Sequence, residues 1–137
     1  MGRILGIDHG DRRIGIAVSD PLHLIASPKK TLFVKNKNEA IDLIIEIISE
    51  QEIEKIVIGL PFGMRGNETL QTQHVRDFGL LLEEKGYDVI YLDERLSSKS
   101  AKDALIKQNI KPSRQKHLVD QTAAALILQQ YLDSQPK

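Results

Sequence analysis

Short apolar runs alternate with segments of helical periodicity along most of this chain, and this alternation constrains the fold more than any other feature. The runs at residues 55–59 (KIVIG) and 89–92 each follow a segment in which apolar residues recur three or four positions apart. Two neighbouring strands joined by a helix run parallel to one another. The pattern therefore predicts an α/β fold with a largely parallel sheet flanked by helices.

The helix boundaries follow from capping signals. Asn36 with Glu39 three residues later resembles a capping box and starts a helix that reaches about residue 51. Asn67 is the predicted cap of a second helix, which ends near residue 85 because Gly86 suits a helix C-terminus. The serines at 97 and 98 are predicted to cap a third helix to about residue 108, and a final helix is expected over about residues 118–132.

An antiparallel hairpin is predicted at the N-terminus, in front of the parallel strands. Residues 3–8 and 13–19 are rich in β-branched side chains and are separated by a tight turn around Gly10. Residues 30–34 form a plausible edge strand after the hairpin. Small residues at 6, 15 and 17 leave room on the hairpin, and the alanines at 123–125 would let the last helix lie close on the sheet.

Length and composition narrow the class of protein. At 137 residues we expect one domain, residues 1–137. Lys and Arg balance Asp and Glu at 19 each, so a basic surface for an anionic partner must be local. The absence of cysteine excludes disulfides, thiolate ligands and a cysteine nucleophile. This composition suits a reducing cytosol and, with an N-terminal apolar run too short for a signal peptide, we expect a cytoplasmic protein.

Acidic residues follow two of the predicted parallel strands. Asp8 ends the first, and Asp93 and Glu94 end the last, so they are expected at one edge of the sheet. Clustered carboxylates repel one another unless a cation intervenes, and oxygen ligands favour Mg²⁺ or Mn²⁺ over zinc. Taken singly, Asp8 could instead cap a turn, and Asp93 and Glu94 could be an ordinary solvated strand end.

Two further segments could meet phosphate. The loop GLPFGMRGNET, residues 59–69, is rich in glycine and precedes a helix N-terminus, where free N–H groups favour anions. Residues 104–119 contain five basic side chains and no acid, which suits either a solvated loop or a nucleic-acid contact. Near the start of the last predicted helix lies Asp120, whose carboxylate the helix dipole would keep ionised. The positions of the predicted elements do not by themselves place Asp120 at the edge of the sheet where Asp8, Asp93 and Glu94 are expected.

Four stretches resemble the YqgF family, also called RuvX and described as Holliday junction resolvases, within the ribonuclease H-like superfamily. They are GIDHGDRRIGIAVSD, VIGLPFGMRGNE, YLDERLSS and VDQTAAALILQQYL, and together they span nearly the whole chain. The resemblance implies a ribonuclease H-like five-stranded mixed sheet, an acidic site for divalent metal, and Asp120 beside Asp8. It also implies nuclease activity, either at the 5′ end of pre-16S rRNA or on branched DNA. Where the family often has Asp-Gly, this chain has Arg65-Gly66, which favours phosphate over metal contact there.

The resulting hypothesis is hydrolysis of phosphodiester bonds by two Mg²⁺ or Mn²⁺ ions about 4 Å apart. Asp8 would bridge the ions, and Glu94 and Asp120 would complete the site, with Asp93 as the alternative to Glu94. His9 could carry a proton, although a lone histidine beside an aspartate is more often supporting or exposed. Candidate nucleic-acid contacts, any of which could instead form a surface ion pair, are Arg12, Arg13, Arg65, Arg95, Lys107, Lys111, Arg114 and Lys116.

Two rival classes remain. The stretch GIDHG looks similar to the phosphate hairpin of actin-like and sugar-kinase ATPases, but those proteins use two such domains, and this chain has Asp11 where they usually place Ser or Thr. The other rival is a non-catalytic nucleic-acid-binding module. No membrane partner is expected, and either a monomer or a homodimer is compatible with the sequence.

Overall fold

The computed structural model describes residues 2–94 and 112–136, and side chains within these ranges except at 112–117. Five strands form one mixed sheet in the order β3-β2-β1-β4-β5, which confirms the predicted fold class. The strands are β1 (Arg3–His9), β2 (Arg13–Ser19), β3 (Ala26–Phe33), β4 (Ile53–Leu60) and β5 (Val89–Asp93). The helices are α1 (Lys37–Glu50), α2 (Leu70–Glu84) and α4 (Pro112–Ser134).

Strand directions bring three carboxyl ends to one edge of the sheet. β1 pairs with β4 and β4 with β5 in parallel, whereas β2 pairs antiparallel with both β1 and β3. The β1–β2 turn is closed by the Gly10 N–H, which donates to the Arg13 carbonyl at 2.9 Å. The predicted hairpin and the common direction of the three parallel strands are therefore both confirmed.

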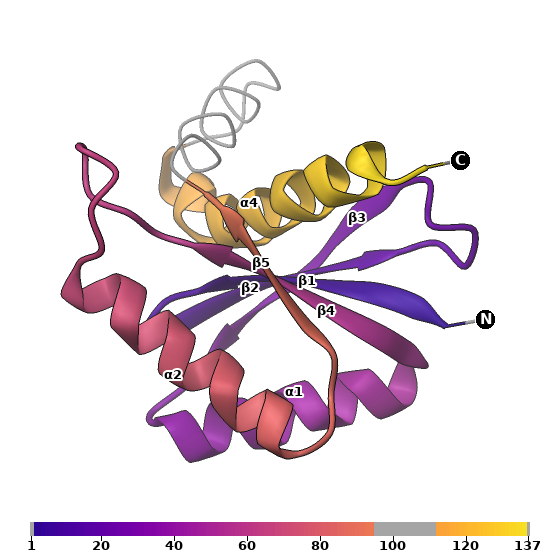
Figure 1. Ribbon diagram of the computed structural model, residues 1–137, viewed down its shortest axis with the longest axis horizontal. Coiled ribbons are helices and arrows are strands. Elements are labelled where there is room, and N and C mark those ends of the chain that lie inside the picture. The colour runs from indigo at the N-terminus through magenta and orange to yellow at the C-terminus, as the bar shows by residue number, and fades with distance from the viewer. Residues whose placement is uncertain (1, 95–111, 137) are drawn as a thin grey trace.

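Helices cover both faces of the sheet, with α4 on one face and α1 and α2 on the other (Figure 1). Alternate residues of each strand serve the two layers. Leu5 and Ile7 of β1 pack with the α1 and α2 side, while Ile4 packs with α4. Asp8 has the same parity as Ile4, so its side chain belongs to the α4 face.

The α4 face is built from small residues, which allow close backbone approach. A methyl group added at Gly6 would meet the Ala124 carbonyl oxygen at 2.9 Å, and one added at Gly15 would overlap the Asp120 carbonyl oxygen. Ala17 and Ala124 are fully buried between the layers. The prediction that small residues let the last helix lie close on the sheet is confirmed.

Three predicted boundaries were wrong. The cap of α2 is Thr69 instead of Asn67, because Thr69 and Thr72 form a reciprocal capping box. Helix α4 begins at Pro112, six residues earlier than predicted, since proline is well tolerated in the first turn of a helix. Strand β3 begins at Ala26 because its edge position tolerates Pro28. The predicted third helix, residues 97–108, lies outside the described residues.

The capping box of α2 also anchors the loop that follows β4. Thr72 is fully buried, its hydroxyl accepts from the Thr69 N–H at 2.9 Å, and it donates to the Pro61 carbonyl. Thr72→Val keeps the shape of the side chain and removes both bonds. We expect a loss of about 1–3 kcal/mol in the free energy of unfolding, measured by urea denaturation. Thr72→Ser, which keeps the hydroxyl, should recover part of it, and equal stability of all three proteins would contradict this role.

Candidate active site

Asp8 and Glu94 meet at the carboxyl edge of the parallel strands. Asp8 lies near the end of β1, and the Glu94 N–H continues the ladder of β5 by donating to the Leu60 carbonyl at 3.2 Å. The two side chains are hydrogen-bonded to each other. Burial, and then the neighbouring Asp8 charge, raise the pKa of Glu94 to about 9. Protonated Glu94 therefore donates to the Asp8 carboxylate, and the pair shares one proton at neutral pH.

Asp120 reaches the same edge from α4. Burial raises the pKa of Asp8, and the negative charge of Asp120 raises it further, so the two carboxylates lie within electrostatic range. The Asp120 carboxylate is 3.1 Å from the Arg13 guanidinium, measured from Oδ2 to Nε. Asp120 does not open its helix as expected, because α4 starts eight residues earlier, at Pro112. Its position comes from packing of α4 over Gly15 instead of from a helix terminus.

The carboxylate oxygens of Asp8, Glu94 and Asp120 are the kind of ligand that Mg²⁺ or Mn²⁺ prefers. The three side chains are not, however, arranged around a common metal position. Within residues 2–94 and 112–136, as far as their side chains are described, no three His, Cys, Asp or Glu side chains are grouped closely enough to hold a metal ion. A divalent cation would nevertheless stabilise two adjacent half-buried carboxylates that share a proton, because it can replace that proton. The Asp120 carboxylate is paired with the Arg13 guanidinium.

Strand alternation separates the two acids between which the sequence could not choose. Asp93 is exposed, and Glu94 is the one that contacts Asp8. Glu94 has this room because Gly59 of β4 carries no side chain: a methyl group there would lie 2.6 Å from a Glu94 carboxylate oxygen. Sequence reasoning missed this role of Gly59, although the alternation along β4 places it on the same face as Gly6 and Gly15.

The predicted phosphate contacts fall into several places. Arg13 is paired with Asp120, Arg12 is exposed in the β1–β2 turn, and Arg65 is exposed in the loop that extends beyond the sheet between β4 and α2 (Figure 1). Gly66, next to Arg65, has a φ of 79°. The loop thus presents a cation beyond the acidic edge. Of the remaining predicted contacts, Arg95, Lys107 and Lys111 lie outside the described residues, and Arg114 and Lys116 lie where side chains are not described.

His9 lies on the opposite face from Asp8. Its ring packs against Phe78 of α2, with ring centroids 4.4 Å apart. Burial lowers the pKa of His9 to about 4, so the ring is neutral at pH 7. This position gives the imidazole no direct access to the carboxylate pair.

Two solved structures with similar folds are resolvases. The RuvC of T. thermophilus, solved in complex with a Holliday junction substrate, matches with a TM-score of 0.60 and 22% identity, covering 96% of this chain and 94% of that one. The Fowlpox virus resolvase, solved with Holliday junction DNA, matches with a TM-score of 0.63 and 11% identity, covering 98% and 99%. The fold is therefore ribonuclease H-like, of the kind found in RuvC-type resolvases.

Sequence relatives narrow this class. A model of the family described as "RuvX: Holliday junction resolvase" matches residues 2–134. Proteins named "Putative pre-16S rRNA nuclease" from Clostridium tetani and Dictyoglomus thermophilum are 42% and 36% identical, each over 96% of both chains. This chain belongs to the RuvX family, and the predicted family is confirmed. The described helices include none that is both long and apolar enough to cross a bilayer.

Proposed function

We propose that this chain is a divalent-metal-dependent nuclease that processes the 5′ end of pre-16S rRNA, with Asp8, Glu94 and Asp120 as its catalytic carboxylates. The observation that carries the proposal is the hydrogen-bonded Asp8–Glu94 pair at the carboxyl edge of the sheet. Burial of the two acids side by side raises the pKa values of both, and such perturbed acids are concentrated at functional sites.

The metal site would form from the same three residues. Asp8 and Glu94 would hold Mg²⁺ or Mn²⁺ after losing the shared proton, and Asp120 would join them by exchanging its Arg13 partner for the metal. Bound dications supply an activated water and stabilise the leaving 3′ oxygen. Arg13, once released, would be free to hold a phosphate oxygen through its planar guanidinium.

Other residues of the chain would position the nucleic acid. Arg13 and Arg65 lie at this end of the sheet, so they would contact phosphates on either side of the bond that is cut. Their contribution would be independent of base sequence and would weaken with salt. Because the charge of the whole chain is balanced, an anionic strand would be attracted by local groups of cations such as these arginines.

The rRNA substrate is proposed from the relatives. The two relatives described above match over nearly their whole length and carry the name "Putative pre-16S rRNA nuclease". A cytoplasmic location would follow from that substrate.

Cleavage of a Holliday junction is the second candidate, favoured by the description of the matching family model. A resolvase makes two symmetric cuts, so this activity would require a homodimer on the junction. A non-catalytic nucleic-acid-binding module is the remaining alternative.

One experiment separates the three. The purified chain is incubated with Mn²⁺ and either precursor rRNA or a four-way DNA junction, and the released ends are mapped. We expect defined 5′ ends on the RNA, abolished by EDTA. Paired symmetric nicks confined to the junction would favour the resolvase. Tight binding to RNA with no divalent-dependent cleavage of either substrate would overturn the nuclease proposal in favour of a binding module.

A further inference from the structure

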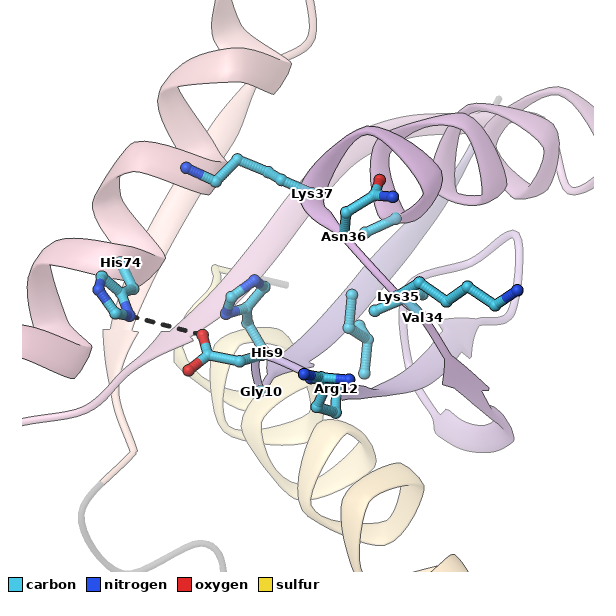
Figure 2. A pocket seen from close by; sticks show the side chains of 11 residues that line it. His9, Gly10, Arg12, Val34, Lys35, Asn36, Lys37 and His74 are labelled. Carbon is cyan, nitrogen blue, oxygen red and sulfur yellow. Dashed lines mark ion pairs between the residues drawn. The ribbon is translucent and has the colours of Figure 1, made fainter.

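A second candidate site lies on the face of the sheet opposite the carboxylates. A cavity of ≈ 290 Å³ opens beside the β1–β2 turn. Three separate parts of the chain line it: the turn itself, the segment that enters α1, and α2 through His74 (Figure 2). The cavity is about the size of the smaller ligand sites in proteins. It is therefore large enough for a phosphoryl group and part of the attached sugar.

The charge around this cavity is positive. Arg12, Lys35 and Lys37 line it, and Asp11 is its one carboxylate. Asp11 is engaged with His74, whose Nδ1 is 3.5 Å from an Asp11 carboxylate oxygen (Figure 2). The three cations thus outnumber the single acid, and the carboxylate of that acid already faces the His74 ring.

Part of the cavity lining is apolar. Ile14, Val34 and Ala40 line it and are buried in the core between the sheet and α1. Apolar residues in the same lining as cationic side chains reduce competition from water, which strengthens charge-assisted hydrogen bonds to an anion. The combination suits a phosphoryl group better than a neutral ligand.

The place of the cavity relates it to the carboxylates. His9, Gly10, Asp11 and Arg12 all line it, and they follow Asp8 directly in the chain. Because successive residues of β1 point to opposite sides of the sheet, Asp8 lies on the α4 face and His9 lies on the face that carries the cavity. A strand of nucleic acid that passes around the edge of the sheet would meet both sites within a few nucleotides.

We propose that this cavity binds a phosphoryl group of the nucleic-acid substrate, using Arg12 and Lys37 as its main ligands and acting separately from the carboxylate site. The identity of the substrate rests on the function proposed above. The phosphoryl group could be a terminal 5′-monophosphate or an internal diester, and these two sources share the same chemistry.

The first test measures binding without metal. Inorganic phosphate is titrated into the intact protein in EDTA, and the backbone amide shifts of residues 9–12 and 34–37 are followed by NMR. We expect saturable shifts at these amides, in Asp8→Asn as well as in the unmodified protein. Arg12→Gln/Lys37→Gln should weaken binding at least about tenfold, because two charged ligands are lost.

A charge-matched control accompanies the titration. Lys30→Gln/Lys85→Gln removes the same charge from exposed positions outside the cavity, and it should bind phosphate like the unmodified protein. Equal weakening in both double variants, or shifts spread over all basic surfaces, would overturn the proposal. Because the titration requires neither metal nor turnover, its outcome is independent of whether the nuclease proposal holds.

The second test identifies the source of the phosphoryl group. Cleavage of otherwise identical RNAs carrying a 5′-phosphate or a 5′-hydroxyl is compared in Mn²⁺. A preference for the 5′-phosphate that disappears in Arg12→Gln/Lys37→Gln assigns a terminal group. An equal rise in KM for both RNAs, with kcat retained, assigns an internal diester. An unchanged KM for both RNAs in this variant would overturn a role for the cavity in substrate binding.

Discussion

Asp8→Asn is expected to abolish metal-dependent cleavage and, at the same time, to make the metal-free protein more stable. Asparagine keeps the shape of the side chain but has no negative charge with which it would hold a dication, so the cleavage rate should fall at least about 10³-fold. Removing one charge from a desolvated acidic cluster should add about 1 kcal/mol to the free energy of unfolding, or about 4 °C in melting temperature. Cleavage assays in Mn²⁺ and thermal melts in EDTA measure the two effects.

Neighbouring acids provide the comparison for this variant. Glu94→Gln should lose cleavage as Asp8→Asn does, whereas Asp93→Asn, at an exposed position, should stay within about threefold of the unmodified protein. Both variants replace a carboxyl group by an amide of the same shape at adjacent positions, so the contrast tests which of the two side chains points toward Asp8. A folded Asp8→Asn protein that still cut at the original rate, or a larger loss at residue 93 than at residue 94, would rule out the proposed ligand set.

Gly15→Ala should impair catalysis from a position that touches no substrate. The added methyl group would overlap the backbone of α4 at Asp120, and a helix backbone cannot move aside as a flexible side chain can. The helix would have to shift, carrying Asp120 away from Asp8. Misplacement by about 1 Å can cost about 10²-fold in kcat, and overpacking of this kind costs about 1–3 kcal/mol of stability. Single-turnover cleavage and urea denaturation measure these losses.

Gly86→Ala is the control for the destabilisation itself. Gly86 follows α2 with a φ of 95°, and an added methyl group would meet nothing within 4 Å. Alanine in this conformation costs about 1 kcal/mol through backbone strain. It should lower stability and leave kcat unchanged. If Gly15→Ala lost stability but kept kcat in the same way, α4 would have no role in positioning Asp120.

Much of the architecture could be predicted from the sequence because its signals are local. The apolar run at residues 55–59 and the turn at Gly10 are specified by residues close in the chain, and both elements were found as expected. The boundary errors have the same origin. Thr69 caps α2 in a capping box with Thr72, but Asn67 is also a suitable cap residue in the sequence. Only the folded geometry decides between such neighbouring candidates.

The site was less predictable because it depends on contacts between distant segments. The sequence left open whether Asp93 or Glu94 joins Asp8, because only the pairing of β5 with β4 determines which of the two side chains points toward Asp8. The ion pair between Arg13 and Asp120 joins residues more than a hundred positions apart. No local pattern encodes this pairing, so the sequence left open whether Arg13 contacts phosphate or forms an ion pair, and it did not indicate Asp120 as the partner.

The β1–β2 turn is short and is closed by its own hydrogen bond between Gly10 and Arg13. Any ligands held on its two sides would thus keep a constant separation, set by a few peptide units. An RNA bound on both sides of the turn would therefore be cut at a fixed distance from the bound phosphate, independently of the bases in between.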